Sequence, residues 1–220
     1  MKDPIDHLLL KIHEDHCFGE PSEKPKITYS KVPCSFKMDN DWPDNLFDLL
    51  GSYKVKVPMK EGRIILYEDC ISKFGLIFYE TFGKTIGKSR QFCINLICEI
   101  VLWHELGHWI THWMPGRDKN KWNTKSYNSG SIDVHEGLAQ LFTHYAIINI
   151  KDNKLRTNYL LLFSLMLQNQ APCYHKFLDI LGHKKFGWNQ CFTALTMIRI
   201  VEKADEATMD YFIKHLYISF

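Results

Sequence analysis

The chain has 220 residues, enough for one domain with a substantial hydrophobic core. Hydrophobic residues make up 45% of the sequence and aromatic residues 14%, which excludes an intrinsically disordered protein. Charged residues make up 24%, and the formal net charge is only +2, so the composition gives no indication of a nucleic acid or an anionic membrane surface as partner.

The N-terminus lacks the long apolar stretch of a signal peptide, because the run Leu8-Leu9-Leu10 is cut off by Lys11. The most apolar stretch, residues 92–103, has about half the length of a membrane span. The seven cysteines are odd in number and contain no Cys-x-x-Cys pair, which is typical of buried free thiols. We therefore expect a cytoplasmic protein without a membrane-spanning segment; its oligomeric state stays open.

The first part of the chain predicts few regular elements. Residues 5–14 have the pattern of a short amphipathic helix, and residues 15–45 are polar and irregular apart from a strand-like piece at 27–32. Asp44 to Leu50 form a helical turn that ends at Gly51. Residues 53–57 alternate with the period of a strand, and a second strand at 63–67 makes a hairpin plausible.

The rest of the chain predicts helices. They cover residues 69–82, 91–114, 132–150, 155–169, 173–182, 188–203 and 206–217, with a polar connection at 115–131. The helix at 91–114 is apolar almost all round, so we expect it to lie centrally between other elements. Strands followed by helices are the order of an α+β domain. We predict one domain over 1–220, with an irregular segment at 1–52, a core at 53–150 and a helical part at 151–220.

The central helix contains the motif H-E-x-x-H at residues 104–108. Residues four apart lie on the same face of a helix, so His104 and His108 can bind one zinc ion together. Glu105 points elsewhere but can still reach a water at the metal, as the general base of a zinc peptidase does. Polar groups on a central apolar helix are costly unless something satisfies them, and a metal ion does.

Zinc needs a third protein ligand and an open position for water. The extended motif H-E-x-x-H-x-x-G-x-x-H is not present, because position 111 is Thr111 and position 114 is Met114. His112 comes too early for that pattern; it could contact a carboxylate, or it could be an ordinary residue at a helix end.

The next helix begins with D-V-H-E-G-L-A-Q-L-F at residues 133–142. Together with residues 104–109, this segment resembles the gluzincins, the H-E-x-x-H peptidases whose third ligand is a glutamate on a following helix. Residues 136–139 look like the Glu-Gly-Phe-Ala signature of the aminopeptidase branch, and the pattern is also similar to compact proteases that cleave repressors. The resemblance covers about residues 60–150. It implies Glu136 as the third ligand, Zn²⁺ as the cofactor, a protein or peptide as substrate and a zincin-like fold.

In that fold a small mixed or antiparallel sheet lies beside the metal helix, and the strand at 63–67 could be the edge strand that pairs with substrate, or it could be buried. The small residues Gly137 and Ala139 would let the second helix pack closely against the metal helix. If Glu136 is not a ligand, His135, Asp133 and His144 are the next candidates.

The resemblance also implies a downstream Tyr or His that stabilises the oxyanion of the transition state. The candidates are His144, Tyr145, Tyr174, His175 and His183. His144 is the first choice, because it lies at i+8 from Glu136 on the same helix face.

Some features depart from the family pattern. The Gly-x-Met-Glu-Asn motif that grips a substrate N-terminus is absent, so aminopeptidase activity is not implied. Gln140 replaces the carboxylate that orients a ligand histidine in thermolysin-like relatives, and its amide could accept the same hydrogen bond.

The sequence predicts a zinc-dependent peptidase in which Glu105 takes a proton from water and passes it to the leaving amine. The alternative is a regulatory protein that keeps the zinc scaffold without turnover, or a latent protease whose flanking segments block the site. In a latent form, the thiolate of Cys17 or Cys34 could cap the zinc.

Overall fold

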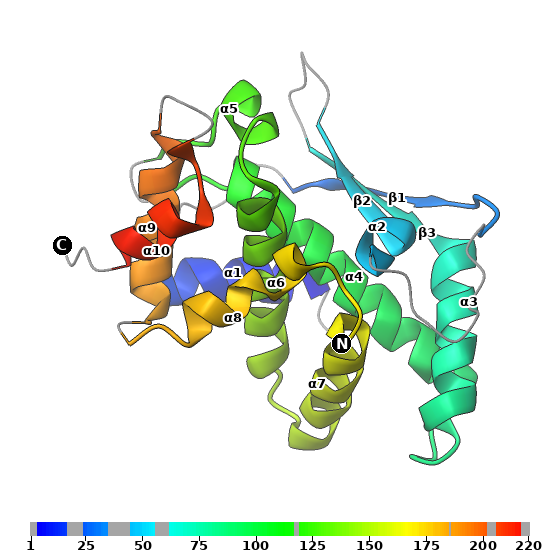
Figure 1. Cartoon of the computed structure of the whole chain (residues 1–220). Helices are drawn as coiled ribbons and strands as arrows, with labels where there is room; N and C mark the ends of the chain where they lie inside the picture. Colours follow the sequence, from blue (N-terminus) through cyan, green and yellow to red (C-terminus); the bar gives the residue numbers. More distant parts are fainter. Residues whose placement is uncertain are drawn as a thin grey trace.

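A computed structural model describes residues 4–16, 24–34, 45–55, 62–116, 119–184, 186–201 and 206–216 (Figure 1). The strands are β1 (Lys26–Ser30), β2 (Gly51–Lys54) and β3 (Arg63–Tyr67). The α-helices are α1 (Pro4–His16), α2 (Leu46–Leu50), α3 (Glu68–Phe78), α4 (Arg90–Trp113), α5 (Thr124–Asn128), α6 (Ile132–Ile148), α7 (Asn153–Leu167), α8 (Lys176–Leu181), α9 (Trp188–Arg199) and α10 (Met209–His215). A π-helical turn, η1 (Tyr79–Gly83), and a 3₁₀ turn, η2 (Pro172–His175), complete the described elements.

The three strands form a mixed sheet in the order β1-β3-β2. β3 is the central strand, parallel to β1 and antiparallel to β2. Ile64 and Leu66 on β3 are buried, while Arg63 on the other face is exposed. One face of the sheet therefore packs on the hydrophobic core, and β2 is left as an edge strand.

α4 is the central element of the fold. Ser89 caps its N-terminus by accepting a hydrogen bond from the backbone N–H of Phe92. Every residue from Ile100 to His112 is buried, because the sheet and the helices that follow α4 cover it on opposite sides (Figure 1). A helix apolar all round has no solvent face, so this stretch is held in place on all sides.

α6 packs on α4 at a point where both helices carry small residues. A Cβ atom added to Gly107 would lie 2.7 Å from the Cα atom of Ala139, so only glycine fits at position 107. Gly137 faces Met209 and Lys176 instead. The expectation that small residues bring the two helices together therefore holds for Ala139, with Gly107 as its partner, and not for Gly137.

A buried arginine holds the C-terminal end of α4. The Arg199 side chain, on α9, donates hydrogen bonds to the backbone carbonyls of Ile110 (2.6 Å), Thr111 (2.9 Å) and Asn120 (3.4 Å). A cation at the negative end of a helix dipole is favourable, and the carbonyls of Ile110 and Thr111 belong to the last turn of α4, where intrahelical donors run out. The C-terminal helices thus fix the end of the central helix.

The predicted small sheet is present as a three-stranded mixed sheet, and the described part of the chain is otherwise mostly helical, with α1 before the strands and α2 among them. The strand predicted at 63–67 is confirmed to the residue, but it is the interior strand, so β2 supplies the free edge instead. β2 begins at Gly51 and not at Tyr53. The polar connection at 115–131 contains the short helix α5, which Asn123 caps by accepting from the backbone N–H of Lys125.

Within the segment 1–52, the expected helix, strand-like piece and helical turn correspond to α1, β1 and α2. Within the described ranges, no helix is both long enough and apolar enough to cross a membrane.

Replacement of the buried arginine tests how much the C-terminal helices stabilise α4. We predict that Arg199→Met lowers the free energy of unfolding by about 2–4 kcal/mol, because it leaves buried carbonyls without donors. Urea denaturation measures this, with the exposed Arg90→Met as matched control. Equal midpoints for the two variants would contradict the structural role of Arg199.

Candidate metal centre

Three buried side chains converge where α4 and α6 cross. The Nε2 atom of His104 lies 3.2 Å from Oε2 of Glu136, and Nε2 of His108 lies 3.6 Å from the same oxygen. The two imidazole rings stand at 85° with centroids 4.8 Å apart. One ligand atom from each residue lies within 4.8 Å of the other two, close enough for all three to bind one metal ion.

The residues fit a metal ion chemically. His104 is 0% exposed, and both His108 and Glu136 are 8% exposed. Nε2 of His104 and Oε2 of Glu136 are buried without a hydrogen-bond partner. Buried polar atoms are normally satisfied, and a metal ion bound by these lone pairs would satisfy both.

The charges of the cluster shift its pKa values. Burial alone would raise the pKa of Glu136, but the adjacent His108 and His104 outweigh burial and hold that pKa well below its usual range. Burial would lower the pKa of His108, but Glu136 and Glu105 raise it to about 9. Burial lowers the pKa of His104, and His108 adds to this effect against the raising contributions of Glu136 and Asp48. The carboxylate of Glu136 is therefore ionised, as a metal ligand must be.

Glu105 lies on another side of α4, against the edge strand. Its carboxylate accepts a hydrogen bond from the backbone N–H of Tyr53. A Cβ atom on Gly51 would stand 3.0 Å from Oε1 of Glu105, so the glycine leaves room for the carboxylate. Burial raises the pKa of Glu105 to about 8, against the lowering effect of His108. Glu105 is thus a fixed carboxylate with increased basicity beside the two histidines.

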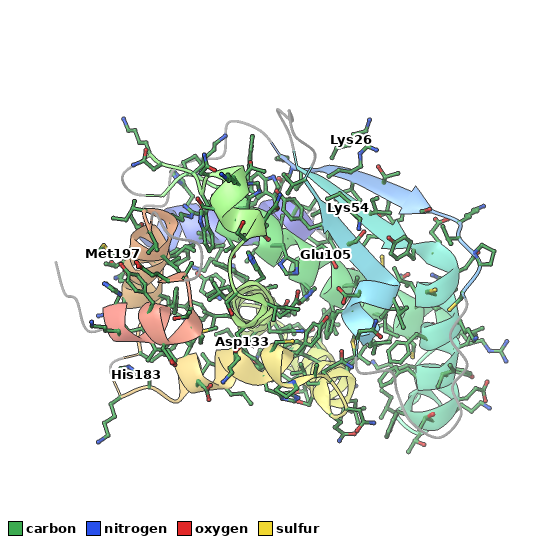
Figure 2. All side chains as sticks on the ribbon, turned by 45° about the horizontal axis from the view of Figure 1, so that its top comes forward. Lys26, Lys54, Glu105, Asp133, His183 and Met197 are labelled. Carbon is green, nitrogen blue, oxygen red and sulfur yellow. The ribbon has the colours of Figure 1, made fainter. Side chains whose placement is uncertain are left out.

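A pocket of about 510 Å³ opens over this cluster. Glu105, His108 and Glu136 line its floor. Its walls come from neighbouring elements, with Asp48 from α2, Ser52 to Lys54 from β2, Tyr127 and Asn128 from α5, and His135 from α6 among them. Figure 2 shows Lys54 and Glu105 on the same side of the molecule. Two of the candidate ligands, His108 and Glu136, therefore border a pocket that β2 also lines.

An aromatic layer holds one wall of the pocket. His112 exchanges hydrogen bonds with the hydroxyls of Tyr53 (2.8 Å at Nδ1) and Thr124 (3.2 Å at Nε2). Its ring stacks on Tyr127 with centroids 4.3 Å apart. Burial lowers the pKa of His112 to about 3, with Arg199 adding to the effect, so the ring is neutral. His112 thus connects α4 to β2 and α5, and no hydrogen bond or ion pair joins it to a carboxylate of the described residues.

His144 does not line the metal pocket. Together with His175 it lines a second, mostly apolar pocket of about 390 Å³ between α6, α7 and α8. Eight residues on a helix span about 12 Å, so the shared face with Glu136 does not bring the two side chains together. Its position therefore gives His144 no contact with a substrate at the metal centre.

The remaining downstream candidates do not line the metal pocket either. Tyr145 packs on Trp188 with ring centroids 4.3 Å apart. His183 lies far from Glu105 in Figure 2. Tyr174 comes nearest, with its ring 6.0 Å from that of His104, and its hydroxyl donates to Asp48 (3.2 Å).

The alternative ligands do not join the cluster. Among the described residues, only His104, His108 and Glu136 form a group that could hold a metal ion. His135 lines the pocket, but its ring packs against Tyr127 at 4.3 Å, and Asp133 does not line the pocket. The hydrogen bond expected of Gln140 is not formed, because both of its amide atoms and Nδ1 of His104 are buried without partners.

The described residues give no support for a metal capped by Cys17 or Cys34. Cys17 lies outside the described residues. Cys34 forms a side-chain hydrogen bond with Cys70 at the start of α3. Neither thiol therefore supports a capped metal in the part of the chain that the structure describes.

No motif in the sequence marks Tyr127, Tyr53 or Asp48 as pocket residues. Tyr127 lies in a stretch that was predicted to be a loop, and its placement depends on the short helix α5. The only local signal was Asn123, an N-cap residue type, ahead of Thr124-Lys125-Ser126. Asp48 and Tyr53 come to the site through the turn between α2 and β2, which no motif marks.

Comparison of the chain with protein-family models, with curated proteins and with solved structures finds no match. The metal centre therefore rests on its own geometry.

Metal content of purified variants tests the ligand set. We predict about one bound divalent metal ion per chain in the unchanged protein and a loss of at least tenfold in affinity for His104→Ala, His108→Ala and Glu136→Ala, because each removes one of three protein ligands. Plasma mass spectrometry after dialysis measures the content. The controls His144→Gln and Asp133→Asn should keep the metal. If Glu136→Ala kept the metal and one of these controls lost it, the third ligand would be reassigned to the control residue.

Proposed function

We propose that this chain is a zinc-dependent peptidase of the gluzincin type with a zincin-like fold. One observation carries the proposal: His104, His108 and Glu136 form a group that could bind one metal ion, and two of them, His108 and Glu136, line an open pocket together with Glu105. This is the residue set that metal-assisted hydrolysis of a peptide bond requires.

The donor set favours zinc. Two imidazoles and one carboxylate, with an open side toward the pocket, are the ligands of catalytic zinc sites. When bound, zinc would supply Lewis acidity, which lowers the pKa of a water molecule and polarises the substrate carbonyl. His104 and Glu136 are almost fully buried, so the ligands are held without large movements.

Glu105 is the proposed general base. Its carboxylate is anchored by the Tyr53 N–H and has a raised pKa, and both properties favour uptake of a proton from water in the pocket. The same carboxyl group would then give the proton to the leaving amine. This role needs a group near the ligands that is not itself a ligand, and among the described residues Glu105 is absent from the metal-binding group.

Tyr127 is the proposed donor to the oxyanion, in place of His144. It lines the pocket and is close enough to Glu105 and Glu136 for their charges to affect it. Burial raises the pKa of its phenol well above the usual value, so the hydroxyl stays protonated and can donate. The ring is fixed between His112 and His135, each with its centroid 4.3 Å away. A fixed donor loses little freedom when charge develops on the substrate.

The edge of β2 is the proposed binding site for the substrate backbone. Among the described residues, β2 is paired on one side only, with β3, and residues 52–55 border the pocket. An extended peptide could add to this edge as a further strand and lie across Glu105. That mode of binding suits a protein or peptide substrate.

The general base is tested by Glu105→Gln. We predict that this variant keeps its zinc and loses at least about 10²-fold in the rate of peptide hydrolysis, because the amide cannot accept a proton. A quenched fluorescent peptide library, with and without chelator, measures activity. Glu80→Gln, an exposed change on η1, is the matched control. Zinc-loaded protein that cleaves no peptide would favour a non-catalytic zinc scaffold.

The oxyanion donor is tested by Tyr127→Phe, which removes one hydroxyl and keeps the ring. We expect kcat to fall about 10²-fold, with zinc content and KM little changed, because the lost hydrogen bond forms mainly in the transition state. Tyr211→Phe on α10 is the control. Unchanged kcat would remove Tyr127 from the mechanism and leave Glu105 in place.

A further inference from the structure

Three cationic side chains lie directly opposite one another across the sheet. Lys26 on β1 is paired in register with Arg63 on β3, and Arg63 is paired with Lys54 on β2. Residues in register point to the same face, and all three are exposed. We call Lys26, Arg63 and Lys54 the basic row.

The basic row is unfavourable for the fold. Like charges directly opposite on neighbouring strands destabilise a sheet, and a pattern of opposite charges would cost nothing. Within the described ranges, none of the three residues forms an ion pair. Residues that destabilise the fold without a compensating contact are typical of functional sites.

The basic row is continuous with the metal pocket. Lys54, its end member, lines that pocket together with Ser52 and Tyr53. Figure 2 shows Lys26 and Lys54 on the two outer strands, with Glu105 beyond Lys54. A chain that lies along the free edge of β2 and then turns at Lys54 across the exposed face of the sheet would pass over Arg63 and Lys26. The row therefore borders the path of a substrate and is separate from the ligands.

We propose that the basic row binds an acidic segment of the polypeptide substrate, on one side of the bond placed at the metal centre. The inference rests on the proposed peptidase function and adds a substrate class to it: proteins or peptides with two or three Asp or Glu residues close to the cleaved bond. Carboxylates match the row because each can pair with one cation.

An acidic polypeptide suits the row better than a nucleic acid. The row has three charges in a line across a short sheet, and the whole chain has a net charge of only +2. Nucleic-acid surfaces combine wider basic patches with stacking aromatic side chains. The adjacent unpaired strand edge recognises an extended peptide backbone.

Binding of matched peptides tests this without turnover. The probes are three fluorescent peptides of one sequence in which three adjacent positions are all Glu, all Gln or all Lys, added to zinc-loaded Glu105→Gln protein. Each matched surface charge contributes about two- to fivefold, so we expect the Glu peptide to bind about tenfold or more tightly than the Gln peptide. The Lys peptide should bind most weakly, and the differences should shrink at high salt.

Variants assign the effect to the row. Arg63→Gln should reduce the advantage of the Glu peptide at least threefold, and the triple change Lys26→Gln, Arg63→Gln, Lys54→Gln should abolish it. Lys154→Gln, an exposed change on α7, should leave it intact. Arg63→Gln should also keep or raise the melting temperature, because it relieves repulsion. If Arg63 instead stabilised the fold, Arg63→Gln would lower the melting temperature and leave the preference for the Glu peptide unchanged.

Other results separate this inference from the proposed function. Hydrolysis of all three peptides at equal rates by the unchanged protein would overturn the acidic-substrate inference and support the peptidase. Binding of the Glu peptide through the basic row without any hydrolysis would support the acidic-segment site and overturn the peptidase. A single-stranded oligonucleotide of equal charge that binds more tightly than the Glu peptide would overturn the inference.

Discussion

The structure depends on the close contact of two helices at Gly107 and Ala139. That contact brings a carboxylate on α6 within 3.6 Å of two imidazoles on α4. Burial of three ionisable groups is costly, and Nε2 of His104 and Oε2 of Glu136 lack a hydrogen-bond partner. Bound together by one cation, the same groups would instead hold the two helices in register. The metal centre and the core of the protein are thus one feature.

The other elements hold this contact and give access to it. Arg199 fixes the end of α4 through its carbonyls, and His112 connects the same helix to β2 and α5. The sheet covers α4 on the side of Glu105, where Gly51 leaves room for the carboxylate. The edge strand then leaves one side of the centre open. An interior held rigid by packing, with one open face, is the arrangement that a binding or catalytic site requires.

Much of this arrangement could be predicted from the sequence, because it follows from local patterns. The H-E-x-x-H spacing placed His104 and His108 on one helix face, and the apolar pattern placed that helix at the centre. Glu136 was predicted from a family resemblance, and the geometry brings it to the same point. The pocket wall could not be predicted, because Asp48, Tyr53 and Tyr127 reach it through long-range pairing and through a five-residue helix. Helix phase alone favours His144 as the oxyanion donor, but phase ignores the rise along the helix axis that separates His144 from Glu136.

X-ray absorption spectroscopy of the zinc-loaded protein tests the central claim most directly, since it reports the atoms around the metal. The account predicts a first shell of nitrogen and oxygen at about 2.0–2.2 Å, with scattering from two imidazole rings. A sulfur shell at about 2.3 Å, or a single imidazole, would contradict a centre built from His104, His108 and Glu136.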